Sequence, residues 1–276
     1  MPRPGFNSAN MARGAGAAVL LAATLLAASP ATAQERDYCP ARPGLGDTPC
    51  TIAPGRVSVE IGVADWQHDS EAGVVTDTIT LADALVRAGI DARTEIDIGW
   101  TPYVRERTRT GGAVAASVSS GDVTLGLRRN LASPDGGGVS AALLPFVTLP
   151  VGRAPGGAGD WSAGVELPAS FDLGHGLSLQ STTTIAAAVD EDRHGRHFAA
   201  SEVVGLGIAL TDSVSLTLEG EVDRDEDPSG SATDARAGAS LAWSASDRLQ
   251  LDIGAVAGLD RGATGVEIYA GISRRF

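Results

Sequence analysis

One short stretch, VDEDRHGRH, gathers the side chains best suited to metal chemistry: Asp190, Glu191, Asp192, His194 and His197. Carboxylates and imidazoles together can bind several divalent metals. A metal site also needs a fixed ligand geometry, and the Gly and Arg residues in this stretch favour a solvated loop instead. We therefore predict no metal site here.

Catalysis by a nucleophile would need a Ser, Cys or carboxylate beside a positioned base. The chain has four histidines, with His68, His194 and His197 in predicted outer loops and His175 in a short inner turn. The sequence places none of them in a strand next to a Ser and a carboxylate. The stretch GRAPGGAGD lacks the Lys-Ser or Lys-Thr ending of a phosphate-binding loop. We predict no catalytic residue and no cofactor, with an outer-membrane hydrolase as the alternative enzymatic hypothesis.

The N-terminus has the layout of a secretory signal peptide over residues 1–33: early arginines, the apolar run GAAVLLAATLLAA and the cleavage pattern Ala31-Thr32-Ala33. The only two cysteines, Cys39 and Cys50, follow it in a stretch rich in Pro and Gly. Because an exported chain meets an oxidising compartment, the pair predicts a disulfide that closes a small loop. Residues 34–55 would then form a periplasmic N-terminal segment.

The charge of the chain excludes a nucleic-acid partner, because 34 acidic residues face only 21 basic ones. From residue 56 onward, apolar and polar residues alternate with a period near two, which favours strands over helices. Most of these stretches match the length of about 9–11 residues that a tilted strand needs to cross a bilayer. We predict twelve strands, over residues 56–66, 74–88, 93–103, 121–131, 139–149, 161–173, 177–189, 197–210, 214–223, 232–243, 249–259 and 265–276.

The connections between these stretches are alternately short and long, and the longest is VRERTRTGGAVAASVSS. Such alternation, with an even number of strands, is typical of an outer-membrane barrel with tight periplasmic turns and longer extracellular loops. A soluble β-sandwich would show the same period, but its strands usually run about 5–6 residues. Most aromatic residues lie at strand ends, as interfacial girdles require. We therefore predict an all-β fold, a transmembrane antiparallel up-and-down barrel over residues 56–276.

In such a barrel the apolar faces contact lipid and the polar faces line the interior. In the first strand, Val57, Val59, Ile61 and Val63 would face lipid, opposite Ser58, Glu60, Gly62 and Ala64. The predicted interior is mainly acidic and favours cations. An alternative is a plugged barrel in which the carboxylates pair with arginines and with the N-terminal segment. The predicted pore-lining residues are Glu60, Glu95, Asp97, Asp122, Arg128, Glu166, Glu219, Glu221, Asp252 and Glu267, with Arg275 as a further basic partner.

The chain ends abruptly on Phe276, inside the last alternating stretch. In a closed barrel the last strand pairs with the first, so no polar tail is needed. A terminal strand ending in Phe also resembles the signal that the barrel-assembly machinery reads in outer-membrane proteins.

Two motifs carry a family resemblance: PFVTLPVGR followed by GAGDWSAGVELPASFDL, and the earlier stretch GDVTLGLRRNL. Together with the ending GISRRF, they resemble the outer-membrane family of transporters of the MetA pathway of phenol degradation, over roughly residues 56–276. The resemblance implies passage of small molecules, including aromatic or apolar compounds, across the outer membrane. We predict outer-membrane lipid, lipopolysaccharide and small-molecule solutes as partners; the sequence gives no oligomeric state. The alternative is a structural or secretion-associated barrel, like the amyloid-export channel of the same superfamily. That channel has an added periplasmic helical region for which residues 34–55 leave no room.

Overall fold

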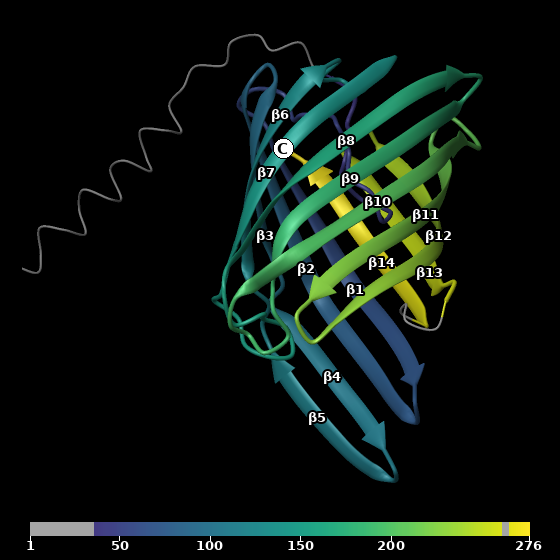
Figure 1. Ribbon diagram of the computed structural model, residues 1–276. Coiled ribbons are helices and arrows are strands. Elements are labelled where there is room, and N and C mark those ends of the chain that lie inside the picture. The colour runs from purple at the N-terminus through teal and green to yellow at the C-terminus, as the bar shows by residue number, and fades with distance from the viewer. Residues whose placement is uncertain (1–35, 261–264) are drawn as a thin grey trace, which may run out of the picture. The chain divides into compact units, whose positions relative to one another are not determined.

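The computed structural model describes residues 36–260 and 265–276, in which regular structure consists of strands (Figure 1). The signal peptide predicted over residues 1–33 lies outside these residues. In the described part of the chain, no helix has the length and apolarity to span a bilayer. The strands are β1 (Val57–Glu71), β2 (Val74–Asp91), β3 (Thr94–Trp100), β4 (Tyr103–Thr110), β5 (Ala113–Ser119), β6 (Val123–Ala132), β7 (Val139–Leu149), β8 (Ser162–Gly174), β9 (Leu177–Val189), β10 (Arg196–Ala209), β11 (Val214–Asp227), β12 (Gly230–Ser246), β13 (Leu249–Gly258) and β14 (Val266–Arg275).

Twelve of these strands form a closed antiparallel barrel. β1 pairs with β2 on one side and with β14 on the other, so first and last strands meet. The last residue takes part in this closure, because the Phe276 N–H donates to the Val57 carbonyl at 2.8 Å. Closure leaves no unpaired edge in the barrel wall, as a spanning β-structure requires. The predicted fold class is confirmed.

The distribution of polar residues is the reverse of that in a soluble protein. The side chains of Ile98 and Ile253 are 44% and 53% exposed on the outer surface, whereas Ser58 and Glu60 are fully buried inside. Along each strand these two kinds of residue alternate, because successive side chains point to opposite faces. Lipid covers the outer apolar faces, so the polar interior must satisfy its own hydrogen bonds or hold water.

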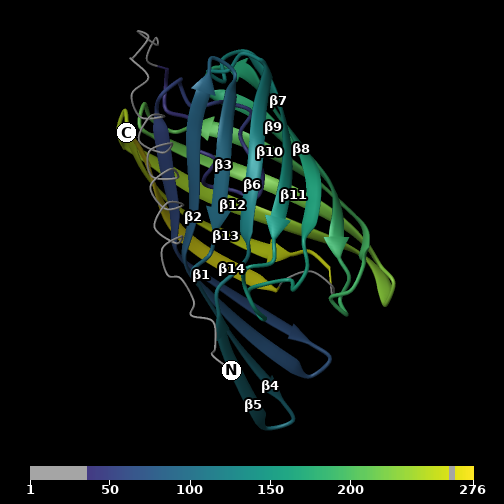
Figure 2. The same cartoon turned by 90° about the vertical axis from the view of Figure 1, so that its left-hand side faces the viewer.

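The longest predicted loop is not a loop. Residues 103–119 form the hairpin β4–β5, which extends the sheet beyond the barrel rim (Figure 2). β2 pairs with β3 along its second half and with β4 along its first half. The hairpin turns at Gly111 and Gly112, both at positive φ, which two-residue hairpin turns require. The many small residues obscured its alternation in the sequence.

A bulge in β1 changes which residues face lipid. Val63 is skipped in the pairing with β14, and Val63 and Ala82 are both skipped in the pairing with β2. An extra residue shifts the alternation by one. The prediction that Ala64 faces inward is therefore wrong: Ala64 and Trp66 are exposed on the outside, and Asp65 points inward.

Candidate functional site

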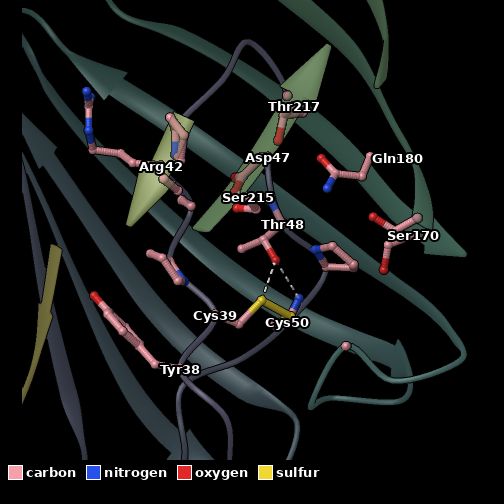
Figure 3. Close-up of a pocket in the computed structure, with 18 of the residues that line it drawn as sticks. Tyr38, Cys39, Arg42, Asp47, Thr48, Cys50, Ser170, Gln180, Ser215 and Thr217 are labelled. Atoms are coloured by element: carbon pink, nitrogen blue, oxygen red, sulfur yellow. Dashed lines mark hydrogen bonds between the residues drawn. A yellow bond between two sulfur atoms is a disulfide. The ribbon is translucent and has the colours of Figure 1, made fainter. Parts of the chain in front are cut away.

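Residues 36–55, which we call the N-terminal segment, occupy the barrel interior, where they contact inward side chains of the wall. The segment contacts inward side chains from opposite sides of the wall, including Glu60 on β1 and Glu219 on β11. Cys39 and Cys50 form a disulfide, with their Cα atoms 6.2 Å apart, so the predicted pairing is present (Figure 3). The disulfide closes the middle of the segment into a compact loop.

Arg87 on β2 holds the two ends of that loop. Its guanidinium donates to the carbonyl of Cys39 at 2.9 Å and to that of Cys50 at 3.0 Å. The same fully buried group pairs with Glu95 at 2.8 Å and with Glu60 at 3.1 Å. A buried charge is tolerated only when it is paired and hydrogen-bonded, and Arg87 meets both conditions.

Arg128 on β6 makes a second attachment. It pairs with Asp47 of the segment at 2.7 Å, with Asp97 at 2.9 Å and with Glu95 at 2.9 Å. It also donates to the carbonyl of Thr48. One guanidinium thus connects the barrel wall to the segment through both a side chain and the backbone.

Three inward carboxylates bind the backbone of the segment, and one of them is Glu95, which accepts the N–H group of Ile52. Glu219 accepts the N–H groups of Leu45 and Gly46 at 2.9 and 3.1 Å. Glu60 accepts those of Ala41 and Arg42 at 2.9 and 3.1 Å. Hydrogen bonds from backbone N–H groups to an ionised carboxylate are stronger than those between neutral groups. They fix the path of the segment.

The far side of the segment is attached to β13. Arg42 pairs with Asp252 at 3.1 Å, and its carbonyl accepts from the Gln250 side chain at 2.8 Å. The Arg42 guanidinium also lies 5.5 Å from the centre of the Tyr269 ring. The segment is therefore held from β1, β2, β6, β11 and β13 together.

Two titratable groups of the segment reflect this environment. Burial, followed by the nearby Glu60 carboxylate, raises the pKa of Tyr38 to about 12. Burial alone would raise the pKa of Asp47 as well, but the Arg128 guanidinium outweighs it and the pKa of Asp47 falls below its usual value. Asp47 is therefore an ionised anchor at neutral pH.

A cavity of about 420 Å³ remains between the segment and the wall formed by β8, β9 and β11 (Figure 3). On the wall side most of the lining is uncharged and polar, including Ser170, Gln180, Ser215 and Thr217, and Asp172 on β8 adds one carboxylate. The charged residues that hold the segment lie mainly on β1, β2, β3 and β6. The interior thus has an anchoring side and an open polar side.

The predicted pore-lining residues fall into two groups. Those that contact the segment or its anchors are Glu60, Glu95, Asp97, Arg128, Glu166, Glu219 and Asp252. Of the others, Glu221 pairs with Arg236, and Glu267 lies beside Asp65. Asp122 accepts the N–H groups of Gly152 and Ala158 at 2.8 Å, so it holds the loop between β7 and β8. Whether any of them lines a conducting path stays a prediction.

Sequence reasoning missed three central residues, Arg87, Arg42 and Asp47. Arg87 shares its inward face with Leu85, so the face did not stand out as polar. A signal existed, because a lone arginine inside a membrane strand must face the interior. Arg42 and Asp47 lie in an irregular segment, where no periodicity indicates a direction.

The loop stretch around residue 190 is more ordered than predicted. His197 lies on β10, and its ring nitrogens are 3.0 Å from Asp190 and from Asp225. Candidate ligand atoms of Asp190, His197 and Asp227 lie within 4.8 Å of one another. An imidazolium donating from both nitrogens satisfies this arrangement without a metal.

His68 also lies in a strand rather than a loop, 2.8 Å from Asp77.

Comparisons with known proteins agree with this geometry. Residues 41–276 match the model of a family described as "Putative MetA-pathway of phenol degradation". The structure resembles an outer membrane channel from Pseudomonas putida F1, with a TM-score of 0.67 and 12% identity, covering 85% of this chain and 99% of that one. It also resembles the translocator domain of the autotransporter NalP from Neisseria meningitidis, with a TM-score of 0.50 and 14% identity, covering 80% and 88%. Among curated proteins, none matches the sequence.

Proposed function

Because the chain belongs to the family of the MetA pathway of phenol degradation, we propose that it is an outer-membrane channel for small molecules. The observation that carries the proposal is the polar cavity beside the N-terminal segment, inside a closed barrel with a lipid-facing exterior. Aromatic or apolar compounds are the proposed solutes on the basis of the family. No covalent step is needed, so the chain is proposed to be a channel and not an enzyme.

The proposed path follows the open polar side of the interior. Solutes would pass along the hydroxyl and amide groups of β8, β9 and β11, beside the segment that is held from both sides of the interior. The inward carboxylates outnumber the inward arginines, so small cations should pass more readily than anions. The domain arrangement we propose is a cleaved leader over residues 1–33, a segment over residues 34–55 and a barrel over residues 56–276.

A secretion-associated or purely structural barrel is the alternative function. The family match and the cavity of about 420 Å³, which can hold a small solute, favour the channel over this alternative. Assembly would depend on Phe276, which is 55% exposed at the end of the closing strand.

Planar-bilayer recording tests the proposal. Purified folded protein should give stable conductance steps with a reversal potential that shows cation preference in a KCl gradient. The double variant Glu219→Gln and Glu60→Gln weakens the backbone anchors and should raise the conductance. Silence from both proteins, with folding verified by heat-modifiable gel mobility, would favour the structural alternative.

A further inference from the structure

Three arginines share one face of β4: Arg105, Arg107 and Arg109, which we call the arginine row. We propose that the arginine row binds the phosphate groups of lipopolysaccharide in the outer leaflet. The proposal rests on the outer-membrane location of the barrel and not on its conductance. Three steps support it: the direction of the row, its free hydrogen-bonding capacity and its height above the hydrocarbon.

The strand register shows that the row faces away from the barrel interior. Arg105 stands opposite Ile79 on β2, which stands opposite Trp66 on β1, and Trp66 is exposed on the outside. Arg107 and Arg109 follow at two-residue steps and therefore share this face. The row thus continues the lipid-facing surface of the barrel.

Along this surface the side chains change from apolar to aromatic to cationic. Ile98 and Trp100 are exposed on β3, Tyr103 begins β4 opposite the outward Leu81, and the row follows. The same order is found in membrane proteins from hydrocarbon through the interface to the headgroups. An outer leaflet of lipopolysaccharide carries phosphates at that last level.

Two of the three arginines leave the N–H donors of their guanidinium groups without a protein acceptor in the described part of the chain. Within residues 36–260 and 265–276, neither Arg105 nor Arg107 makes a side-chain hydrogen bond or ion pair. Arg109 pairs with Asp77 at 2.7 Å, and Asp77 also lies 2.8 Å from His68. Arg107 stands opposite Asp77 in the strand register and interacts electrostatically with it, so Asp77 compensates only part of the charge of the row. In a chain with a net charge of −13, a row of three arginines that keeps a positive charge is a local exception. Guanidinium groups bind phosphate through paired N–H donors, which gives charge complementarity with the proposed ligand.

The opposite face of the hairpin is covered at its base, whereas β5 is exposed from Ala113 to Val118. Val104 is buried there, and the Gly156 N–H donates to the Ser119 hydroxyl at 2.9 Å. The Arg153 N–H donates to the Ser120 carbonyl at 3.3 Å. The loop over residues 150–161 thus supports the base of the hairpin from the inside, and the arginine row is left to face the membrane.

The spacing of the row fits a headgroup layer. Arg105 and Arg109 are about 14 Å apart along the strand, from a rise of about 3.4 Å per residue. With the tilt of about 45° usual for barrel strands, the row spans about 10 Å in depth, starting at the Trp66 level. Over that depth the arginines can reach the lipid phosphates, while the apolar barrel wall next to them stays in the hydrocarbon layer.

The test is a titration of purified, detergent-solubilised protein with bis-phosphorylated lipid A. Replacing the two arginines without a hydrogen-bond acceptor, in the variant Arg105→Gln with Arg107→Gln, should weaken binding about 30-fold, from the usual effect of two cationic side chains at an anionic surface. The matched control is Arg56→Gln, an exposed arginine on the periplasmic side, which should leave the affinity unchanged. Fully dephosphorylated lipid A should bind the unmodified protein as weakly as lipid A binds the double variant.

A second variant lacks residues 103–119, which removes the whole row while β3 and β6 still pair directly. It should fold, as shown by heat-modifiable gel mobility, and lose the same phosphate-dependent affinity. Equal lipid A affinity in the double variant and the unmodified protein would overturn the proposal, and so would an equal loss in the Arg56 control. Dimers formed through the β5 edge in place of lipid binding would also overturn it.

Discussion

Arg128 and Arg129 are neighbours on β6 that point in opposite directions, and they offer a matched test of how the N-terminal segment is held. The Arg128 side chain is 1% exposed and pairs with Asp47 and Asp97, whereas the Arg129 side chain is 51% exposed and pairs with Asp91 at 3.3 Å. We compare the variants Arg128→Met and Arg129→Met.

The expected magnitudes follow from burial. Removing one partner of a buried ion pair costs about 3–5 kcal/mol, because the remaining charge stays buried without compensation. Without Arg128, Asp47 stays buried and unpaired as long as the segment is docked, whereas undocking exposes Asp47 to water. The cost therefore destabilises the docked state. The docking equilibrium should therefore weaken by about two to four powers of ten, at about 1.4 kcal/mol per power of ten. Loss of the exposed Arg129 pair should cost less than about 1 kcal/mol.

Hydrogen exchange followed by mass spectrometry measures this opening directly. The N–H groups of Leu45 and Gly46 donate to Glu219, so they exchange only when the segment leaves its position. In Arg128→Met, the protection of peptides covering residues 40–50 should fall by the factor given above, while the strands keep theirs. Unchanged protection in Arg128→Met, or an equal loss in Arg129→Met, would refute the reasoning.

Three further outcomes are expected. Replacing both Cys39 and Cys50 by Ser should weaken docking of the segment by about 3 kcal/mol, read by the same exchange experiment, because the free chain gains the entropy of an unclosed loop; unchanged protection would contradict this. Because the pKa of Asp47 is lowered, its anchoring contribution is complete above the pKa of free Asp, about 3.9, and is lost as the pH falls through the lower folded value. Bilayer conductance should therefore rise at acid pH, and Asp47→Asn should show the higher conductance already at neutral pH; a variant identical to the unmodified protein at both pH values would argue against this anchor. Ile253→Arg, on the lipid face of β13, should lower the free energy of unfolding in vesicles by about 2–4 kcal/mol, whereas Ile253→Leu should change it little; equal stabilities would contradict a lipid-facing position.

The barrel itself could be predicted from the sequence. The length of each alternating stretch, the sequence of short and long connections and the ending on Phe276 follow from local chain geometry and the thickness of a bilayer. The side chains that face inward followed from the same alternation wherever no bulge intervened. At Val63 and Ala82 the alternation shifts, and a bulge cannot be read from a period of two.

The contents of the barrel were decided by the tertiary structure. Arg42 and Asp252 are 210 positions apart in the chain, and only closure of the ring brings β13 next to the segment. Whether an inward carboxylate faces water, an arginine or a backbone N–H depends on the height and angular position of its strand. The sequence by itself therefore determined a membrane barrel with an acidic interior. The closed ring determined that the carboxylates of this interior hold a segment of the same chain. The physical reason is that charges buried together can pair only once the barrel wall has placed them face to face.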